Sequence, residues 1–330
     1  MMGAKRRGAK QHRSAILVAL GIALAMAAAA PGAAHAQLFV LNNSGTGTVG
    51  EYTTSGATVN ASLISGLNSP GPTLALNALA MDGSGDLFVA NYNSGVVGEY
   101  TTSGATVNAT LISGLSDPYG LALDGSGDLF VSNAYVALSG RPAHHGTVGE
   151  YTTSGATVNA SLISGLGYPA GLALDGSGHL FVTNTTLGTI GEYTTSGATV
   201  NASLISGLSS PFALALDGSG HLFVANYGGT TIGEYTTSGA TVNASLISGL
   251  NGPSGLALDG SGDLFVVNDN SGVVGEYTTS GATINADLIS GLGVSGPVSV
   301  VVAVPEPASF ALAALGLAAL SFRRTRRLAA

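Results

Sequence analysis

The chain has 330 residues, of which 50 are Gly and none is Cys or Trp, and its formal net charge is −8. Only 8% of the residues are charged, against about 25% in an ordinary globular domain, which is unusual for a soluble enzyme. The 45% of hydrophobic residues argue against disorder. The absence of Cys excludes a disulfide scaffold, an iron–sulfur cluster, a thiol nucleophile and a zinc site built on Cys.

The N-terminal segment has the three parts of a secretory signal peptide. A basic head at residues 5–13 precedes an apolar run at 15–30. The small residues Ala34 and Ala36 follow it and lie just before Gln37, which predicts a signal helix over 1–36 and cleavage by signal peptidase after Ala36. An uncleaved N-terminal membrane anchor is the alternative.

The body of the chain is one unit repeated six times. The segment Gly-Glu-Tyr-Thr-Thr-Ser-Gly-Ala-Thr recurs at spacings of 48, 51, 42, 42 and 42 residues. Its copies begin at Gly50, Gly98, Gly149, Gly191, Gly233 and Gly275. A period of about 40–50 residues made of strand-like segments is typical of a β-propeller blade.

Each unit predicts four strands separated by turn residues. In one unit they are 120–124, 129–131, 148–152 and 157–163. An Asp-Gly-Ser-Gly-Asp turn joins the first two strands, and Thr-Ser-Gly-Ala joins the last two. The first two strands are apolar on both faces, which suits inner strands packed between neighbouring blades.

The fourth strand alternates between apolar and polar residues. Val59, Ala61 and Leu63 are expected on one face, with Asn60 and Ser62 on the other. The Asn of this strand also begins a formal glycosylation sequon, which we interpret as the polar face of the strand. The sequon copies are Asn60, Asn108, Asn159, Asn201 and Asn243.

The phase of the repeat predicts how the ring closes. The chain enters at 38–40, a second strand with no first strand before it, and it leaves through 298–303, where the sixth first strand belongs. We therefore predict an all-β, six-bladed propeller of four-stranded blades over 37–303, whose last blade combines 298–303 with 38–64. Such closure hides sheet edges. An open β-solenoid is the competing architecture, but it would need polar capping units at both ends, and the sequence has none.

The stretch Gly-Leu-Ala-Leu-Asp-Gly-Ser-Gly-Asp-Leu-Phe-Val, with a proline just ahead, resembles the NHL-repeat propellers. The prolines are Pro118, Pro169, Pro211 and Pro253. The resemblance implies ligand binding on one face of the ring. Many relatives carry basic residues after the second strand, which are absent here, and the body has one Arg against 17 acids, a net charge of −16. We therefore expect no nucleic-acid partner.

An active site in a repeat protein should break the repeat, because catalysis needs one constellation rather than six. We interpret the repeated Glu as structural or solvating, namely Glu51, Glu99, Glu150, Glu192, Glu234 and Glu276. The repeated Tyr are interpreted as packing residues with the hydroxyl near water, namely Tyr52, Tyr100, Tyr151, Tyr193, Tyr235 and Tyr277. His179 and His221 are interpreted as exposed turn residues, and Asp-Gly-Ser-Gly-Asp as a turn rather than a calcium loop. We expect no metal and no cofactor.

Two insertions break the repeat, nine extra residues within 134–145 and six within 68–80. Connections from second to third strands and from blade to blade emerge on the same face of a propeller, so both insertions belong to one rim. Arg141, His144 and His145 are a candidate ligand lip there for an acidic sugar or carboxylate. A tolerated surface-loop insertion is the alternative.

The C-terminal segment 304–330 combines Pro305-Glu306-Pro307, an apolar stretch and an arginine cluster. The arginines are Arg323, Arg324, Arg326 and Arg327. The apolar stretch 308–322 spans about 22 Å as a helix, short of the ~30 Å hydrocarbon core, and predicts a marginal transmembrane helix with its basic end in the cytoplasm. Together these features resemble the PEP-CTERM sorting signal. The resemblance implies an exosortase that cuts near the motif, transient membrane anchoring, and a final place at the cell surface or in the extracellular matrix of a Gram-negative bacterium, often alongside exopolysaccharide production.

Two functions compete. The first is a non-catalytic binding or scaffold propeller with a glycan or exopolysaccharide as its partner. The second is a metal-dependent enzyme that resembles the lactonase and streptogramin-lyase propellers, with the Asn at the end of each second strand facing the channel mouth. These are Asn91, Asn133, Asn184, Asn226 and Asn268. Nearly identical blades give equal positions rather than a graded metal site, which favours the first function.

Overall fold

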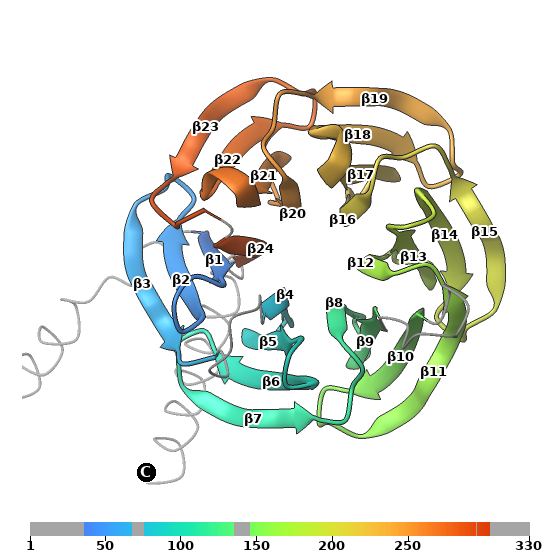
Figure 1. Ribbon diagram of the computed structural model, residues 1–330, viewed down its shortest axis with the longest axis horizontal. Helices are drawn as coiled ribbons and strands as arrows, with labels where there is room; N and C mark the ends of the chain where they lie inside the picture. The colour runs from blue at the N-terminus through green and yellow to red at the C-terminus, as the bar shows by residue number, and fades with distance from the viewer. Residues whose placement is uncertain (1–35, 68–75, 135–145, 295, 304–330) are drawn as a thin grey trace, which may run out of the picture. The chain divides into compact units, whose positions relative to one another are not determined.

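The computed structural model describes residues 36–67, 76–134, 146–294 and 296–303. They form six four-stranded antiparallel sheets arranged as a ring around a central channel (Figure 1). The sheets are numbered here as blades 1 to 6, and in each blade the first strand lies innermost. This arrangement confirms the predicted six-bladed all-β propeller.

Blades 1 to 3 use consecutive strands. Blade 1 holds β4 (Leu76–Met81), β5 (Asp86–Asn91), β6 (Val96–Thr101) and β7 (Thr106–Ile112). Blade 2 holds β8 (Pro118–Leu123), β9 (Asp128–Asn133), β10 (Gly146–Thr152) and β11 (Thr157–Leu166). Blade 3 holds β12 (Pro169–Leu174), β13 (His179–Asn184), β14 (Thr189–Thr194) and β15 (Thr199–Ile205).

Blades 4 and 5 add a short 3-10 turn after the second strand. Blade 4 holds β16 (Pro211–Leu216), β17 (His221–Asn226), η1 (Tyr227–Gly229), β18 (Thr231–Thr236) and β19 (Thr241–Ile247). Blade 5 holds β20 (Pro253–Leu258), β21 (Asp263–Asn268), η2 (Asp269–Ser271), β22 (Val273–Thr278) and β23 (Thr283–Ile289).

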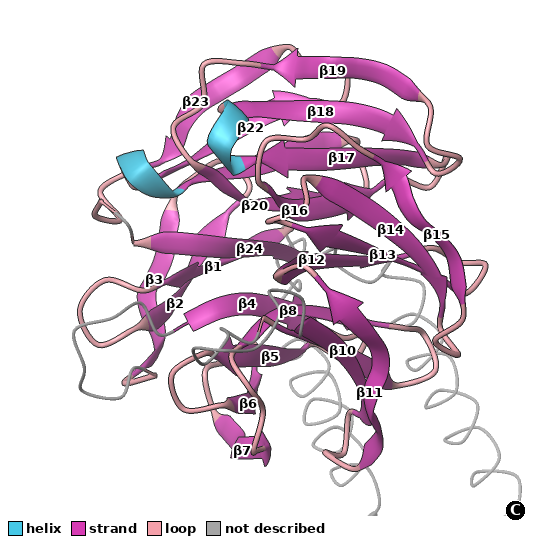
Figure 2. Ribbon diagram, turned by 45° about the vertical axis from the view of Figure 1, so that its right-hand side comes forward, coloured by secondary structure: helices cyan, strands magenta, loops and turns pink. Residues whose placement is uncertain are grey.

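Blade 6 is assembled from both ends of the described chain. It holds β24 (Pro297–Ala303), followed by β1 (Gln37–Asn42), β2 (Thr48–Thr53) and β3 (Thr58–Ser65). In Figure 2, β24 and β1 lie side by side, and they pair antiparallel with Leu38 opposite Val302. The six first strands contact one another in a closed cycle from β4 through β8, β12, β16, β20 and β24 back to β4. The open solenoid is therefore excluded, and the predicted closure is confirmed.

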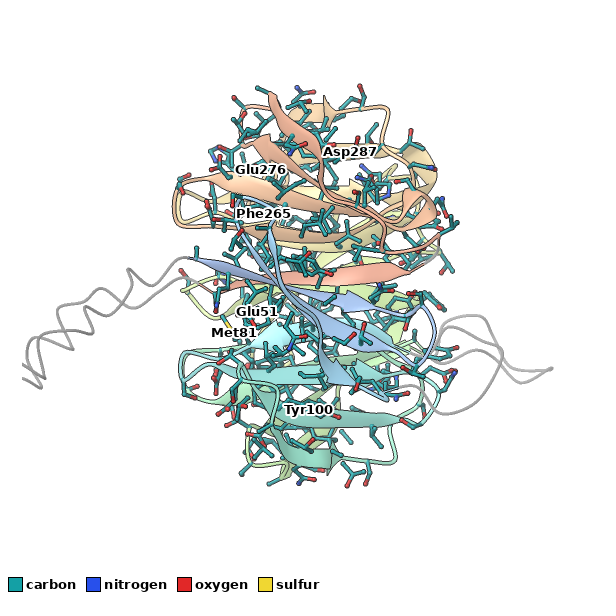
Figure 3. All side chains as sticks on the ribbon, turned by 90° about the vertical axis from the view of Figure 1, so that its left-hand side faces the viewer. Glu51, Met81, Tyr100, Phe265, Glu276 and Asp287 are labelled. Atoms are coloured by element: carbon teal, nitrogen blue, oxygen red, sulfur yellow. The ribbon has the colours of Figure 1, made fainter. Side chains whose placement is uncertain are left out.

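The core of the ring lies between neighbouring blades. One Phe from each second strand is fully buried there, and these residues are Phe39, Phe88, Phe130, Phe181, Phe223 and Phe265. Figure 3 labels Phe265 and Tyr100 among the side chains that fill the blades. Full burial of such a side chain contributes about 1.5–3 kcal/mol, so six equivalent sites give the ring much of its apolar stabilisation.

The repeated Tyr are buried as predicted, but their hydroxyls do not simply face water. Tyr52 is 4% exposed, and its ring lies over Gly50, where an added Cβ would come within 2.8 Å of the Tyr52 hydroxyl. In blades 3, 4 and 5 the Tyr hydroxyl is hydrogen-bonded to the Asn that ends the second strand, as for Tyr193 with Asn184. The Tyr therefore joins the third strand to the second.

The outermost strand departs from the predicted alternation. In β3, Val59 and Ala61 are exposed together with Asn60 and Ser62, and Val59 keeps 52% of its surface. The pairing of β2 with β3 slips between Val49 and Glu51, because Val49 lies opposite Ile64 while Glu51 lies opposite Asn60. This bulge turns the first half of the strand away from the core, so that only its end is buried.

A glycine turn locks each outer strand to the previous blade. Gly239, between β18 and β19, has φ +89, and a Cβ there would lie 2.7 Å from the carbonyl oxygen of Leu204 in β15. Every blade repeats the contact, including Gly56 of blade 6 against Leu288 of blade 5. A positive φ together with this close approach explains why the turn requires Gly.

The terminal segments lie outside the described residues, including the predicted signal helix at 1–36 up to residue 35 and the transmembrane helix at 308–322. Within the described ranges, no helix is long and apolar enough to cross a membrane.

Candidate functional site

Hydrogen bonds show which connections share a face of the ring. The Asn91 side-chain amide, at the end of the second strand of blade 1, donates at 2.6 Å to the carbonyl of Leu67, which lies in the connection that leads into the first strand of the same blade. The Ala134 amide donates to the Asp117 carbonyl at 3.0 Å in the same way. The connections between second and third strands and those between blades therefore emerge together. We call this side the mouth face, and the side that carries the Asp-Gly-Ser-Gly turns the turn face.

The connection between β9 and β10, to which the predicted ligand lip belongs in sequence, begins and ends on this mouth face because it joins a second strand to a third. Arg141, His144 and His145 themselves lie outside the described residues. The sorting-motif residues lie outside them as well, as does Ala34 of the predicted cleavage site, whereas Gln37 opens β1.

The Asn residues that end the second strands are buried, between 2% and 9% exposed. Three of them hold the loop before their own blade or the loop that follows them. Asn91 donates to the Leu67 carbonyl, Asn184 Oδ1 accepts from the Gly167 amide at 3.1 Å, and Asn268 Oδ1 accepts from the Asn251 amide at 3.2 Å. The side-chain oxygens of Asn133 and Asn226 have no partner among the described residues.

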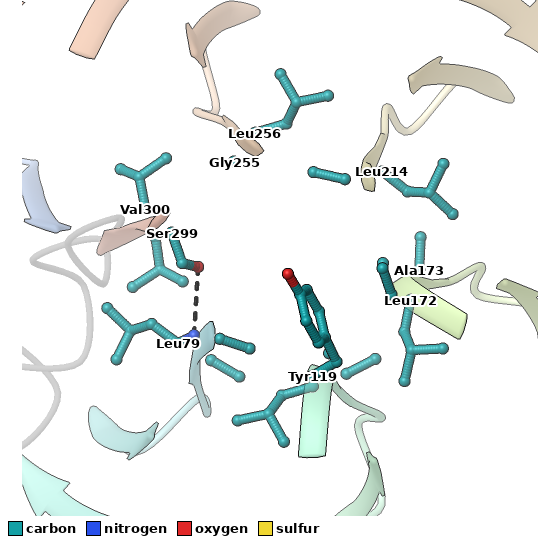
Figure 4. A pocket seen from close by; sticks show the side chains of 18 of the residues that line it. Leu79, Tyr119, Leu172, Ala173, Leu214, Gly255, Leu256, Ser299 and Val300 are labelled. Atoms are coloured by element: carbon teal, nitrogen blue, oxygen red, sulfur yellow. Dashed lines mark hydrogen bonds between the residues drawn. The ribbon is translucent and has the colours of Figure 1, made fainter. Parts of the chain in front are cut away.

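The central channel is a cavity of about 330 Å³ bounded by all six first strands. Figure 4 shows its wall, which is mainly aliphatic, with residues such as Leu79, Leu172 and Leu256. Its polar side chains include Ser254, Ser299 and Tyr119, and the Ser299 hydroxyl accepts from the Leu79 amide at 3.2 Å. Tyr119 reaches from β8 into the channel.

Five aromatic residues gather where the channel opens on the mouth face, and together they are called the aromatic mouth. They are Tyr92, Tyr119, Tyr168, Phe212 and Tyr227. The Tyr119 ring centroid lies 6.2 Å from that of Tyr92, 5.4 Å from that of Tyr168 and 5.2 Å from that of Phe212, all edge-on. Phe212 lies 5.5 Å from Tyr227. Such geometry is favourable between aromatic rings.

The aromatic mouth breaks the six-fold repeat. Tyr119 and Phe212 are the second residues of β8 and β16, where β12 and β20 carry Ala170 and Ser254. Tyr92 and Tyr227 directly follow second strands. Sequence reasoning missed this cluster, although Pro-Tyr-Gly and Pro-Phe-Ala differ visibly from Pro-Ala-Gly and Pro-Ser-Gly.

The side chains of the aromatic mouth are half-buried, unlike the buried repeated Tyr. The pKa of Tyr92 is raised to about 12, mainly by burial and to a smaller extent by the charge of the neighbouring Asp117 carboxylate. The side chains of Tyr92 and Asp117 are also hydrogen-bonded. Burial and a hydrogen bond to Tyr168 raise the pKa of Tyr119. These hydroxyls therefore stay protonated at neutral pH: Tyr92 donates to Asp117 and Tyr119 donates to Tyr168, and the oxygens of both can still accept from a ligand.

Buried hydroxyls fix the strands beneath the aromatic mouth. Ser132 is 0% exposed, accepts from the Gly120 amide at 2.7 Å and donates to the Ala170 carbonyl at 2.8 Å. It thus joins the first strands of blades 2 and 3. Thr183 accepts from the Gly171 amide at 2.8 Å at the equivalent position of blade 3.

Blade 5 brings polar side chains without partners to the same face. Asp269, which opens η2, is 8% exposed, and its Oδ1 has no hydrogen-bond partner among the described residues. Ser254 lines the channel, is 6% exposed, and its Oγ is likewise unpaired within them. The Asp269 amide donates to the Gly252 carbonyl at 3.0 Å, and burial raises the pKa of its carboxyl.

The turn face carries most of the acids. The Asp82 carboxylate accepts from the Ser84 and Asp86 amides at 3.0 and 2.8 Å, which confirms a turn closed by its own side chain. In the same blade the pKa of Glu99 is raised, first by burial and then by the negative charges of Asp86 and Asp82. Within the described ranges, no three His or acidic side chains are grouped so that they could hold a metal ion.

In two blades a His pairs with the first Asp of the turn. His179 Nδ1 lies 2.9 Å from Asp175 Oδ2, and His221 Nδ1 lies 2.9 Å from Asp217 Oδ2. The side chains are 36% and 37% exposed, which fits the predicted exposed turn positions, whereas the pairing was not predicted. The hydrogen bond that His179 makes to the Asp175 carboxylate raises the pKa of His179.

Residues 303–327 match the family model described as the PEP-CTERM protein-sorting motif. No curated protein matches the chain. A chain in the crystal structure of a nidogen/laminin complex is similar with a TM-score of 0.65 and 15% identity, over 82% of this chain and 99% of that one.

Two enzyme structures are similar over a smaller part. A streptogramin B lyase gives a TM-score of 0.53 at 18% identity, over 67% of this chain and 71% of the lyase. A gluconolactonase from Xanthomonas campestris gives 0.54 at 17% identity, over 67% and 75%. Likeness at these identities shows a shared fold and nothing of activity. The chain is therefore a six-bladed β-propeller with a PEP-CTERM motif, a signal for export and sorting to the envelope of Gram-negative bacteria that an exosortase-type enzyme recognises.

Proposed function

We propose that the protein is a non-catalytic binding propeller that holds a glycan, such as an exopolysaccharide, at its aromatic mouth on the cell surface or in the extracellular matrix. The observation that carries the proposal is the convergence of five half-buried aromatic side chains on one entrance of the channel. Sugar rings present C–H faces that pack on aromatic rings, and the Tyr hydroxyl oxygens can accept hydrogen bonds from sugar hydroxyls.

Binding is better supported than a lactonase or lyase reaction by the placement of the polar residues. The two His within the described residues, His179 and His221, lie on the turn face and are paired with Asp. The channel behind the aromatic mouth is lined by small and aliphatic residues together with backbone and hydroxyl groups of the first strands, and among the described residues its lining includes no charged side chain. The lip of Arg141, His144 and His145 is proposed to add hydrogen bonds to the ligand on the blade 2 side.

Sorting is proposed to leave this propeller intact. Signal peptidase removes the chain up to Ala36, the helix at 308–322 anchors it transiently, and the exosortase acts at Pro305-Glu306-Pro307 with the arginine cluster behind it. β24 ends at Ala303, before the motif, so cutting there would keep every strand of blade 6. With Glu306→Ala we expect the protein to accumulate in the membrane fraction of an exosortase-positive host. Unchanged surface delivery would contradict this route.

Glycan binding is tested with the full chain purified in detergent and the exopolysaccharide of the producing cells as the probe. Tyr119→Ala and Phe212→Ala should each weaken retention on the immobilised polysaccharide by about tenfold. Val200→Ala is the control, because Val200 is 52% exposed on an outer strand far from the channel. Equal retention of all four proteins, or of none, would overturn the proposal.

A further inference from the structure

The charge around the aromatic mouth points to the chemistry of its ligand. All 17 acids of the body lie within the described residues, which include no Lys or Arg. The two described His lie on the opposite face. Although most of these acids lie on the turn face, the carboxylates of Asp117 and Asp269 lie at the aromatic mouth, so the local field there attracts a cation and repels an anion.

Asp269 is the specific acceptor in that field. It is 8% exposed, and Oδ1 has no partner among the described residues. An unpaired buried carboxylate is costly, and native proteins usually pair or solvate such groups. Burial raises the pKa of this carboxyl, as that cost requires. A ligand cation would supply the missing partner.

Contacts connect Asp269 to the aromatic mouth. Its amide is bonded to Gly252, and a Cβ at Gly252 would lie 3.2 Å from the ring of Tyr227. The Tyr227 hydroxyl donates to Asn270, the residue after Asp269, at 3.3 Å. From across the channel, the charge of Asp269 contributes to the raised pKa of Tyr119, although burial and Tyr168 contribute more.

Blades 4 and 5 carry two further side-chain oxygens without a partner. They belong to Ser254, which lines the channel, and to Asn226, which directly precedes Tyr227; both oxygens are buried and unpaired within the described part of the chain. A protonated amine has three N–H donors and no acceptor, so it complements a carboxylate, an amide oxygen and a hydroxyl. Aromatic faces within about 6 Å attract such a cation further.

We propose that the unit bound at the aromatic mouth is an amino sugar whose protonated amine is held by Asp269, beside Ser254 and the Tyr227 ring. This inference rests on the proposed glycan-binding function and specifies its ligand. Blade 5, which carries Asp269, stands opposite blade 2 in the ring, so the amine would be held across the channel from Tyr119.

The test compares two tetrasaccharides that differ in charge but hardly in shape. A β-1,4-linked glucosamine tetramer carries a 2-amino group where the glucose tetramer carries a hydroxyl. Calorimetric titration of the full chain at about pH 6, where the amine is protonated, should show about tenfold tighter binding of the glucosamine tetramer. Added salt should reduce this preference.

Asp269→Asn should abolish the preference while keeping the side-chain shape. The matched control is Asp287→Asn, which removes an exposed carboxylate from the outer strand of the same blade and should leave binding unchanged. Ser254→Ala should weaken binding of the glucosamine tetramer by a smaller factor than Asp269→Asn does.

The outcomes separate the two proposals. Equal binding of both tetramers, with no effect of Asp269→Asn, would overturn the amine inference and leave glycan binding standing. If neither tetramer binds while the exopolysaccharide still binds and still depends on Tyr119, the amine inference is overturned and the proposed function is not. Loss of the exopolysaccharide as well would overturn the proposed function too.

Discussion

Val40 of β1 lies directly opposite Val300 of β24, which joins the first strand of the described chain to the last. Both side chains are buried, at 1% and 3% exposure, in one cluster with Leu38 and with Phe265 of the neighbouring blade. The pair therefore links the two chain ends and also links blade 6 to blade 5.

We expect the ring to depend on this strand. A chain that ends at Gly296 lacks β24 and should lose its cooperative thermal transition, because β1 would then present an unpaired, apolar edge. A chain of residues 37–303 keeps β24 and should unfold cooperatively, as followed by circular dichroism. Similar melting of the two chains would show that the closure is not required.

The glycine turns between outer strands give a second prediction. Gly239→Ala places a Cβ at φ +89 and 2.7 Å from the Leu204 carbonyl, so the free energy of unfolding should fall by at least about 1–2 kcal/mol. Gly218→Ala is the control, because nothing lies within 4 Å of its added Cβ. Denaturant unfolding of both variants measures the difference, and equal effects would contradict the proposed contact.

Ser132→Ala tests the hydroxyl that joins blades 2 and 3. It leaves the Gly120 amide without its partner in a buried position, which should cost about 1–3 kcal/mol of unfolding free energy. Ser126→Ala removes a hydroxyl that donates to Asp124 at 2.7 Å in an exposed turn, and should cost less than about 0.5 kcal/mol. A reversed order would show that the bridge adds no stability.

The His–Asp pairs predict a pH dependence of stability. The hydrogen bond that His221 donates to the Asp217 carboxylate raises the pKa of His221. Burial alone would raise the pKa of Asp217, but the hydrogen bonds it accepts from His221 and Ser219 outweigh burial and lower this pKa to about 2. The His contribution is therefore fully present below the unfolded His pKa of about 6.5 and is lost as the pH rises through the folded pKa. The Asp contribution is present above its unfolded pKa of about 3.9 and is lost as the pH falls through the folded pKa.

The variant carrying both His179→Gln and His221→Gln measures this contribution. At about pH 5 it should be less stable than the parent protein by a few tenths of a kcal/mol per pair, since the side chains are over a third exposed and screened by water. At about pH 9 the two proteins should unfold alike. A difference that stays constant between these pH values would contradict the ion pairs.

The blade order and the closure were predictable because they depend on the period and phase of nearly identical units. The exposed face of Val59 was not, because the bulge opposite Glu51 is decided by how β3 meets β2 rather than by the alternation within β3. Pairing partners also escaped prediction, since His179 and Asp175 are read from the sequence only as neighbours in a turn.

The candidate site was harder to predict for a related reason. Tyr119 and Phe212 occupy one strand position in different blades, and Tyr92 and Tyr227 occupy a loop position. Only the ring brings these two positions together at one opening. The predicted site was placed instead at the insertion that carries Arg141, which belongs to a neighbouring connection.

The blade shared between the two ends also determines the order of events during secretion. A chain that emerges N-terminus first exposes β1 early, yet β1 must wait for β24, which is the last strand to arrive. Five blades can assemble behind the leading end while the sixth stays incomplete. The ring can therefore close only after residue 303 has emerged, so the segment that completes the fold lies directly before the sorting motif.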